Sequence, residues 1–157
     1  MEDTPTIAAV RGFLALLNDG AAPSGRELAR ALDQLAMAYH EAPDGDPAEE
    51  DRESPTHGFE NYKERYAKLG KRFPDYGYYA VADPMKPITQ ESLVGDAIDD
   101  LADIAGDLEE VVWRFENLGA DDAHWHFRFL FEIHWGMHLR ELSLYLHANW
   151  LRASDED

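Results

Sequence analysis

Two histidines and a glutamate near the end of the chain stand at helical spacing, in a segment that is otherwise rich in large apolar residues. His134 and His138 are four residues apart and Glu141 lies three residues further on, so on a helix all three share one face. Upstream, Asp103 and Asp107 show the same spacing of four. Neutral imidazole and carboxylate are groups that bind Zn, Fe, Mn or Ni in helical proteins. These five residues are therefore candidate ligands of a divalent metal.

A long helix over residues 121–152 must position the histidines. At about 100° per residue, apolar side chains cover most of its circumference, which predicts the most buried helix of the protein. His134, His138, Glu141 and Tyr145 fall between two apolar edges on its inward side. The first edge consists of Leu130, Ile133, Met137, Leu144 and Leu151, and the second of Phe131, Trp135, Leu139, Leu142 and Leu146. The side expected to face water carries Glu132, Gly136, Arg140, Ser143 and His147.

The segment before this helix is expected to supply its antiparallel partner. Large apolar residues recur at helical spacing over residues 94–115, which predicts a helix over about residues 89–118 that stops at Gly119. The connection to the next helix is short, and a short connection is typical of an antiparallel hairpin. We therefore expect residues 89–152 to form a C-terminal helical hairpin.

The hairpin determines which carboxylates can meet the histidines. Residues equally far from the turn lie at about the same height, because both helices rise by about 1.5 Å per residue. His134 is then expected near Asp107, and His138 near Asp103. On the helical wheel, however, both aspartates lie at the flank or rear of their own apolar seam. They reach the histidines only if the last helix packs against that flank.

The stripe of polar residues has four interpretations. In a structural network, each imidazole donates to an aspartate, to Glu141 or to Tyr145, and the bonds keep the helices in register. Asp99 and Asp100 are expected to belong to the same network. A divalent metal site is the second interpretation, a small-molecule or catalytic pocket the third, and a rotated helix with a solvated stripe the fourth. The sequence lacks the third fixed ligand of an HExxH motif, and no cofactor other than a divalent metal is expected.

The rest of the chain predicts further helices and two irregular segments. Residues 7–20 show helical apolar spacing, and the capping-box pattern SGRE at Ser24 predicts the start of a second helix. Aromatic residues at helical spacing over residues 59–73 are expected to form a core stripe. Residues 78–81 resemble a short strand without an evident pairing partner, which predicts an ordered, extended aromatic connector. Residues 41–56 are rich in proline and carboxylates and predict a mobile acidic loop.

Together these segments predict an all-α fold, an antiparallel bundle of four to five helices in one domain over residues 1–157. The chain contains no cysteine, which excludes disulfides, thiolate zinc sites and cysteine nucleophiles. The N-terminus has no basic region or cleavage site of a signal peptide, and no apolar run approaches the roughly 18 residues of a membrane-spanning helix. We therefore expect a cytoplasmic protein.

The charge of the chain limits its partners. A formal net charge of -18, from 32 acidic and 14 basic residues, argues against direct binding to nucleic acid or to anionic membranes. The leading functional hypothesis is a non-enzymatic protein-interaction or regulatory domain whose partner is a protein with a basic surface. The alternative is a metal-binding protein or an enzyme that uses the Asp, His and Glu residues between the last two long helices.

Two sequence blocks, finally, resemble a known family. VGDAIDDLADIAGDL at residues 94–108 and FEIHWGMH at residues 131–138 look like the most recognisable parts of a bacterial domain-of-unknown-function family, number five-zero-six-three. The YYAVADP connector at residues 78–84 is similar too. The matching positions are Asp99, Asp100, Asp103, His134, Trp135, Gly136 and His138. The resemblance covers roughly the C-terminal half and implies a small helical domain, with no assigned activity to carry over.

Overall fold

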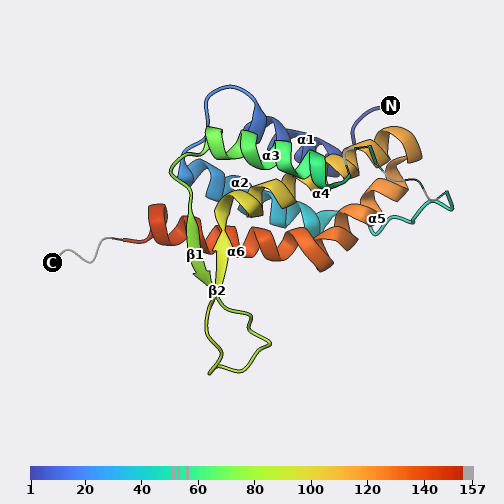
Figure 1. Cartoon of the computed structure of the whole chain (residues 1–157). Coiled ribbons are helices and arrows are strands. Elements are labelled where there is room, and N and C mark those ends of the chain that lie inside the picture. Colours follow the sequence, from blue (N-terminus) through green and yellow to red (C-terminus); the bar gives the residue numbers. More distant parts are fainter. Residues whose placement is uncertain (51, 53, 56, 154–157) are drawn as a thin grey trace.

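The computed structural model describes residues 1–50, 52, 54–55 and 57–153, and helices dominate it (Figure 1). In chain order the elements are α1 (Pro5–Asn18), α2 (Gly25–Glu41), α3 (Phe59–Arg72), β1 (Tyr78–Val81), β2 (Leu93–Asp96), α4 (Ala97–Leu118), α5 (Ala120–Leu130), η1 (Phe131–Trp135), α6 (Gly136–Leu146) and η2 (His147–Leu151), where η denotes a π-helical turn. The prediction of a mostly helical protein is confirmed, and the described residues add one two-stranded sheet. Among the described residues, no helix is both long and apolar enough to cross a membrane.

Helix α4 lies at the centre of the fold. It contacts α1, α3, α5 and α6, and in Figure 1 it runs between α3 and α6. Its core side chains are Ile98, Leu101, Ile104, Leu108, Val111 and Phe115, each at most 5% exposed. The carboxylate of Asp96 caps its first turn by accepting hydrogen bonds from the N–H groups of Ile98 and Asp99. The prediction that the last helix is the most buried one is wrong, because neighbours surround α4 whereas α6 leaves one edge open.

Two π-helical turns interrupt the last helix. The backbone stays right-handed helical from α5 through η1 into α6, since Phe131 and Gly136 both have helical angles. A π turn is wider than an α turn. The angular positions of residues on the two sides of the turn therefore differ from those that a constant 100° per residue predicts. Phe127 and Trp135 are both fully buried, although eight residues of ideal α-helix would place them about 80° apart.

Three of the five residues of one predicted apolar edge of the last helix are exposed, whereas Leu130 and Leu151 of that edge pack against the core. Ile133, Met137 and Leu144 are 60%, 50% and 70% exposed, whereas Leu139 on the other edge is buried. Gly136, expected on the solvent side, is buried instead. The face that meets α4 is therefore rotated from the one that an ideal helical wheel indicates.

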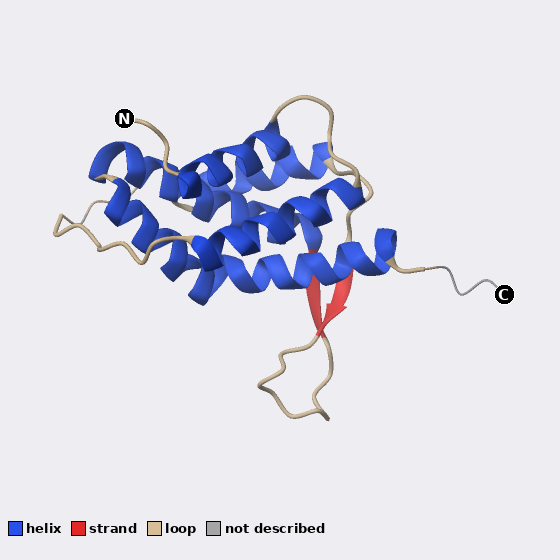
Figure 2. Ribbon diagram, turned by 180° about the vertical axis from the view of Figure 1, so that it is seen from behind, coloured by secondary structure: helices blue, strands red, loops and turns tan. Residues whose placement is uncertain are grey.

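Residues 78–81 have a pairing partner, which corrects the expected isolated connector. β1 pairs with β2 along its whole length in the antiparallel direction. The helix expected from about residue 89 begins only at Ala97, because residues 93–96 form this second strand. Figure 2 shows the two strands projecting beneath α6. The short sheet thus connects α3 to the start of α4.

Side-chain caps define the starts of α1 and α2. The hydroxyl of Thr4 accepts a hydrogen bond from the N–H of Ile7, and that of Ser24 from the N–H of Glu27. The Ser24 cap is the one that the SGRE pattern predicts. Between the end of α1 and the start of α2, the guanidinium of Arg72 donates to backbone carbonyls of the connection. This contact fixes the end of α3 against the first two helices.

Not all aromatic residues of α3 lie in the core, so the expected aromatic core stripe is partly wrong. Phe59 is 69% exposed, whereas Leu69 and Phe73 are buried. Tyr62 and Tyr66 are partly buried and donate their hydroxyl hydrogens to carboxylates at the start of α4. The aromatic face of α3 therefore supplies polar partners as well as apolar contacts.

The acidic segment over residues 41–56 lies partly outside the described residues, which leave out positions 51, 53 and 56. In its described part, the backbone N–H of Ala48 donates a hydrogen bond to the carboxylate of Asp122 in the first turn of α5. The mobility expected for this segment stays a prediction.

Candidate metal centre

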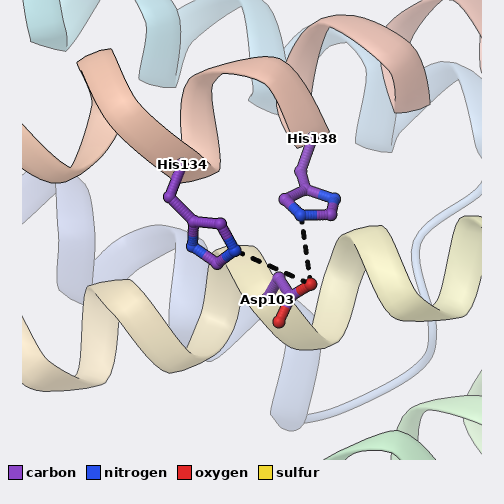
Figure 3. Close-up of side chains that lie close together, drawn as sticks. All are labelled: Asp103, His134 and His138. Atoms are coloured by element: carbon purple, nitrogen blue, oxygen red, sulfur yellow. Dashed lines mark ion pairs between the residues drawn. The ribbon is translucent and has the colours of Figure 1, made fainter.

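Asp103 and the two histidines converge on one point between α4 and the last helix. The Nε2 atoms of His134 and His138 lie 3.9 and 3.1 Å from the same carboxylate oxygen, Oδ2 of Asp103. Figure 3 shows both rings reaching this oxygen from the facing helix. One ligand atom from each of the three residues lies within 4.8 Å of the others. This cluster is compact enough for a single ion to contact all three side chains.

A second carboxylate orients each imidazole. Nδ1 of His134 lies 2.7 Å from Oδ2 of Asp107, and Nδ1 of His138 lies 2.7 Å from Oδ1 of Asp100. When Nδ1–H donates to a carboxylate, a neutral ring has its lone pair on Nε2. Metal-binding histidines show this arrangement in most sites, because the carboxylate fixes the ring and raises its basicity as a ligand. Both Nε2 atoms are thus placed to coordinate.

Asp100 is positioned to orient His138 rather than to bind a metal. It is 2% exposed, and its other oxygen accepts a hydrogen bond from the hydroxyl of Tyr79. Asp99, Asp100 and His138 also form a compact group. A metal there, however, would displace donors that already satisfy a buried carboxylate. The group centred on Asp103 leaves those bonds intact.

The carboxylates also favour protonated imidazole. Burial by itself would lower the pKa of His138, but the hydrogen bonds to Asp100 and Asp103 raise it to about 10. The hydrogen bond to Asp107 raises the pKa of His134 above its usual value. A metal therefore competes with protons for both rings, and its binding releases them.

A small cavity borders the cluster on the side of α3. Its volume is about 290 Å³. The walls include Phe59, Tyr62 and Arg65 of α3 together with Asp103, Asp107 and His134. Arg65 is paired with Glu109 at 2.7 Å, so its charge is already balanced. The cavity offers a small ligand access to the side of the cluster that α6 does not cover.

The structure brings four of the five candidate ligands together. Asp103, Asp107, His134 and His138 form one cluster, at the heights expected for the helical hairpin. The aspartates reach the histidines because the last helix packs against the flank of α4 that they occupy. The geometric objection drawn from the helical wheel therefore does not hold. Metal binding itself stays a prediction.

Glu141 and Tyr145 lie apart from this cluster, although the helical wheel places them on the same stripe. Both line a separate cavity beside β1. The hydroxyl of Tyr145 accepts a hydrogen bond from the backbone N–H of Gly77. Glu141 forms no hydrogen bond or ion pair with any residue that the structure describes. The expectation that Glu141 adds a third carboxylate to the histidines is not met.

Tyrosine hydroxyls complete the polar network, although residue spacing alone does not indicate this role. The three pairs are Tyr62 with Asp99, Tyr66 with Asp96 and Tyr79 with Asp100. The helical spacing of Tyr62 and Tyr66 indicates a shared face, but only packing shows that this face meets the carboxylates of α4. Asp100 belongs to one hydrogen-bonded network with His138 and Tyr79, whereas Asp99 lies close to His138 and accepts its hydrogen bond from Tyr62.

These features define a mostly helical protein with a compact set of Asp and His side chains between α4 and the last helix. The family model described as "Domain of unknown function (DUF5063)" matches residues 4–150. The chain therefore belongs to the DUF5063 family. The match also includes the first two helices and the acidic segment, well beyond the blocks that carry the resemblance in the sequence.

A solved structure shares the fold. The crystal structure of protein BF1032 from Bacteroides fragilis, a structural-genomics target, matches with a TM-score of 0.72 and 16% sequence identity. The match covers 97% of this chain and 94% of that chain. At this identity the likeness shows the fold alone. No curated protein matches the chain.

Proposed function

We propose that this protein binds one divalent transition-metal ion through Oδ2 of Asp103 and the Nε2 atoms of His134 and His138. The convergence of two Nε2 atoms on one carboxylate oxygen supports this proposal. A structural network requires only that polar groups are satisfied. The additional orientation of both Nδ1 atoms by Asp100 and Asp107 is the arrangement that metal sites use.

The donor set limits the metal and its chemistry. Two imidazoles and one carboxylate suit Zn, Fe, Mn or Ni. Three protein ligands leave at least one coordination position for water or a small ligand, which distinguishes such a site from a closed structural one. The cavity beside Tyr62 and His134 has room for that ligand. The proposed role is thus a metal-binding protein whose ion remains reactive, with hydrolytic or oxidative chemistry open to it.

Titration of chelator-treated protein with Zn²⁺, Mn²⁺, Ni²⁺ or, without oxygen, Fe²⁺ tests the proposal. We expect calorimetry to show one ion per chain for at least one of these metals. Asp103→Asn and His134→Ala should each weaken binding by about a hundredfold or more, because each removes a direct ligand. The matched control is His147→Ala, since His147 is exposed in the same helical segment. Absence of stoichiometric binding, or an equal loss in the control, would contradict the proposal.

The orienting carboxylates provide a second test. Asp107→Asn removes the charge behind His134 and keeps the size of the side chain. It should weaken metal binding by about 10–100-fold, less than removal of a direct ligand, because the imidazole remains available but is less well oriented. An effect as large as that of Asp103→Asn would show that Asp107 binds the ion directly.

A protein-interaction role is the second candidate function, and an exposed row of apolar side chains on the last helix favours it. Phe129, Ile133, Met137 and Leu144 are 39–70% exposed, on a chain of net charge -18. Such a surface suits a partner that is basic and partly apolar. Pull-down at low and high salt, with Ile133→Asp compared with the control Met85→Asp, tests this role. Partners retained equally by both variants would exclude the row as the binding surface.

A further inference from the structure

A second cavity lies between strand β1 and helix α6. Its volume is about 560 Å³, against about 290 Å³ for the cavity at the candidate metal centre. This volume falls within the range of small-molecule sites, about 300–1,000 Å³. Tyr78 and Tyr79 of β1 and Glu141, Leu144 and Tyr145 of α6 line it. None of the proposed metal ligands borders this cavity, so it is a separate site.

Glu141 is the carboxylate of this cavity, and no side chain among the described residues forms an ion pair with it. It is partly buried and forms no hydrogen bond or ion pair with any described residue. Burial and the negative charge of Asp100 raise the pKa of Glu141, and the positive charge of His138 offsets only part of this rise. Arg140 also borders the cavity, but its guanidinium lies over the ring of Phe131 at 5.8 Å instead of pairing with Glu141. A cation brought by a ligand would relieve this unpaired charge.

The aromatic walls of the cavity are held in place by their own hydroxyl groups. The ring centroids of Tyr79 and Tyr145 lie 5.1 Å apart. The hydroxyl of Tyr79 donates to Asp100, and that of Tyr145 accepts from the N–H of Gly77. Fixed aromatic rings attract cations and also pack against apolar rings, without losing side-chain freedom when a ligand binds.

We propose that this cavity binds a small organic cation, an arylalkyl primary ammonium, whose ammonium group pairs with Glu141 while its ring packs against Tyr79, Tyr145 and Leu144. Charge complementarity selects a cation, because the chain carries a net charge of -18 and the carboxylate of Glu141 forms no hydrogen bond or ion pair within the described part of the chain. Apolar surface on Leu144, which is 70% exposed, selects a ligand with an apolar part.

Titration with 2-phenylethylammonium tests this proposal, and 2-phenylethanol is the neutral control of nearly equal size and shape. In protein NMR spectra, the amine should shift resonances of Tyr79 and Tyr145 in a saturable way. The alcohol should bind at least about tenfold more weakly, because it cannot form the ion pair with Glu141. Absence of saturable shifts, or equal affinity for the two compounds, would overturn the proposal.

A pair of charge variants tests the role of Glu141 itself. Glu141→Gln should lose the preference for the amine over the alcohol and melt close to the wild-type temperature, since Glu141 forms no hydrogen bond or ion pair with a described residue. Glu64→Gln removes the same charge from an exposed position of α3 and should keep the preference. Loss of preference in both variants, or in neither, would overturn the proposal. Measurement in the presence of chelator keeps the result independent of metal binding.

Discussion

In the proposed site, a proton and a metal compete for the same ring nitrogen of His138. Its Nδ1 atom faces Asp100 and its Nε2 atom faces Asp103, both at hydrogen-bond distance. With a pKa of about 10, the ring is an imidazolium at neutral pH and donates to both carboxylates. A metal would replace the proton on Nε2 and leave the bond to Asp100 in place. The same contacts that stabilise the charged ring therefore orient the neutral ring as a ligand.

We predict that the stability of the metal-free protein falls as the pH rises above neutrality. The pKa of His138 is about 10 in the folded protein, against an ordinary value of 6.5. Its contribution is therefore complete below pH 6.5 and is lost as the pH rises through the folded pKa. One proton gives a slope of up to about 1.4 kcal/mol per pH unit between these values. Urea unfolding with chelator, between about pH 6 and pH 9, measures this slope.

His138→Gln provides the comparison for this prediction. The variant keeps a polar side chain of similar length but does not titrate. It should be less stable than the wild type near neutral pH, and its stability should vary less with pH. Equal slopes for the two proteins would show that another group causes the loss of stability.

The π-helical turn η1 determines which face of the last helix meets α4. Its wider turn brings Phe127 and Trp135 to the same buried side, and the indole N–H of Trp135 donates to the carbonyl of Phe127 at 3.3 Å. Gly136 follows directly, and an added Cβ there would collide with the carbonyl oxygen of Phe131. The π turn therefore requires a residue without a side chain at position 136, between the two histidines of the candidate metal centre.

We predict opposite effects for two glycine substitutions in helices. Gly136→Ala should lower the free energy of unfolding by about 1–3 kcal/mol, because its Cβ has no room beside Phe131. Gly12→Ala in α1 is the matched control, since an added Cβ there meets no atom within 4 Å. It should raise the free energy of unfolding by about 0.5–1 kcal/mol. Urea unfolding of both variants measures the difference, and stabilisation by both would show that the π turn tolerates a side chain.

At the scale of the whole molecule, negative charge outweighs positive charge by 32 acidic to 14 basic residues. Two carboxylates of α4 accept hydrogen bonds from tyrosine hydroxyls, which satisfy them without adding positive charge, and imidazoles pair with Asp107 and Asp100. The remaining carboxylates repel one another in the folded state, where they are closer together than in the unfolded chain. The fold therefore carries an electrostatic cost that added salt can reduce.

We predict that sodium chloride stabilises the protein. Raising the ionic strength from about 0.01 M to about 0.15 M shortens the Debye length from about 30 Å to about 8 Å, which screens repulsion between distant carboxylates. The urea midpoint at neutral pH, with chelator present, should rise over this range. Potassium chloride should have the same effect, because screening depends on ionic strength. A falling midpoint would show that attractive ion pairs, such as Arg65 with Glu109, outweigh the repulsion.

The sequence by itself determined the features that depend on neighbouring residues. The predicted helices over residues 7–20, 59–73 and about 89–118 correspond to α1, α3 and α4, although α4 begins only at Ala97, and the cap at Ser24 opens α2. Apolar spacing and side-chain caps act within one or two turns, so they can be read from the chain directly. The spacing of the two histidines also predicted their heights opposite the two aspartates, since that relation needs only a short turn and a fixed rise per residue.

Only the tertiary structure decided which side chains of different elements come into contact. The π turn shifts the phase of the last helix, so Ile133 is exposed and Glu141 lies in a different cavity from His134. No periodic pattern indicates such a turn, because it is a local change that packing stabilises. β1 likewise finds its partner beyond an intervening connection, and this pairing brings Tyr79 to Asp100. Spacing along the chain sets the period of each element, whereas the rotation and neighbours of that element depend on contacts between residues far apart in sequence.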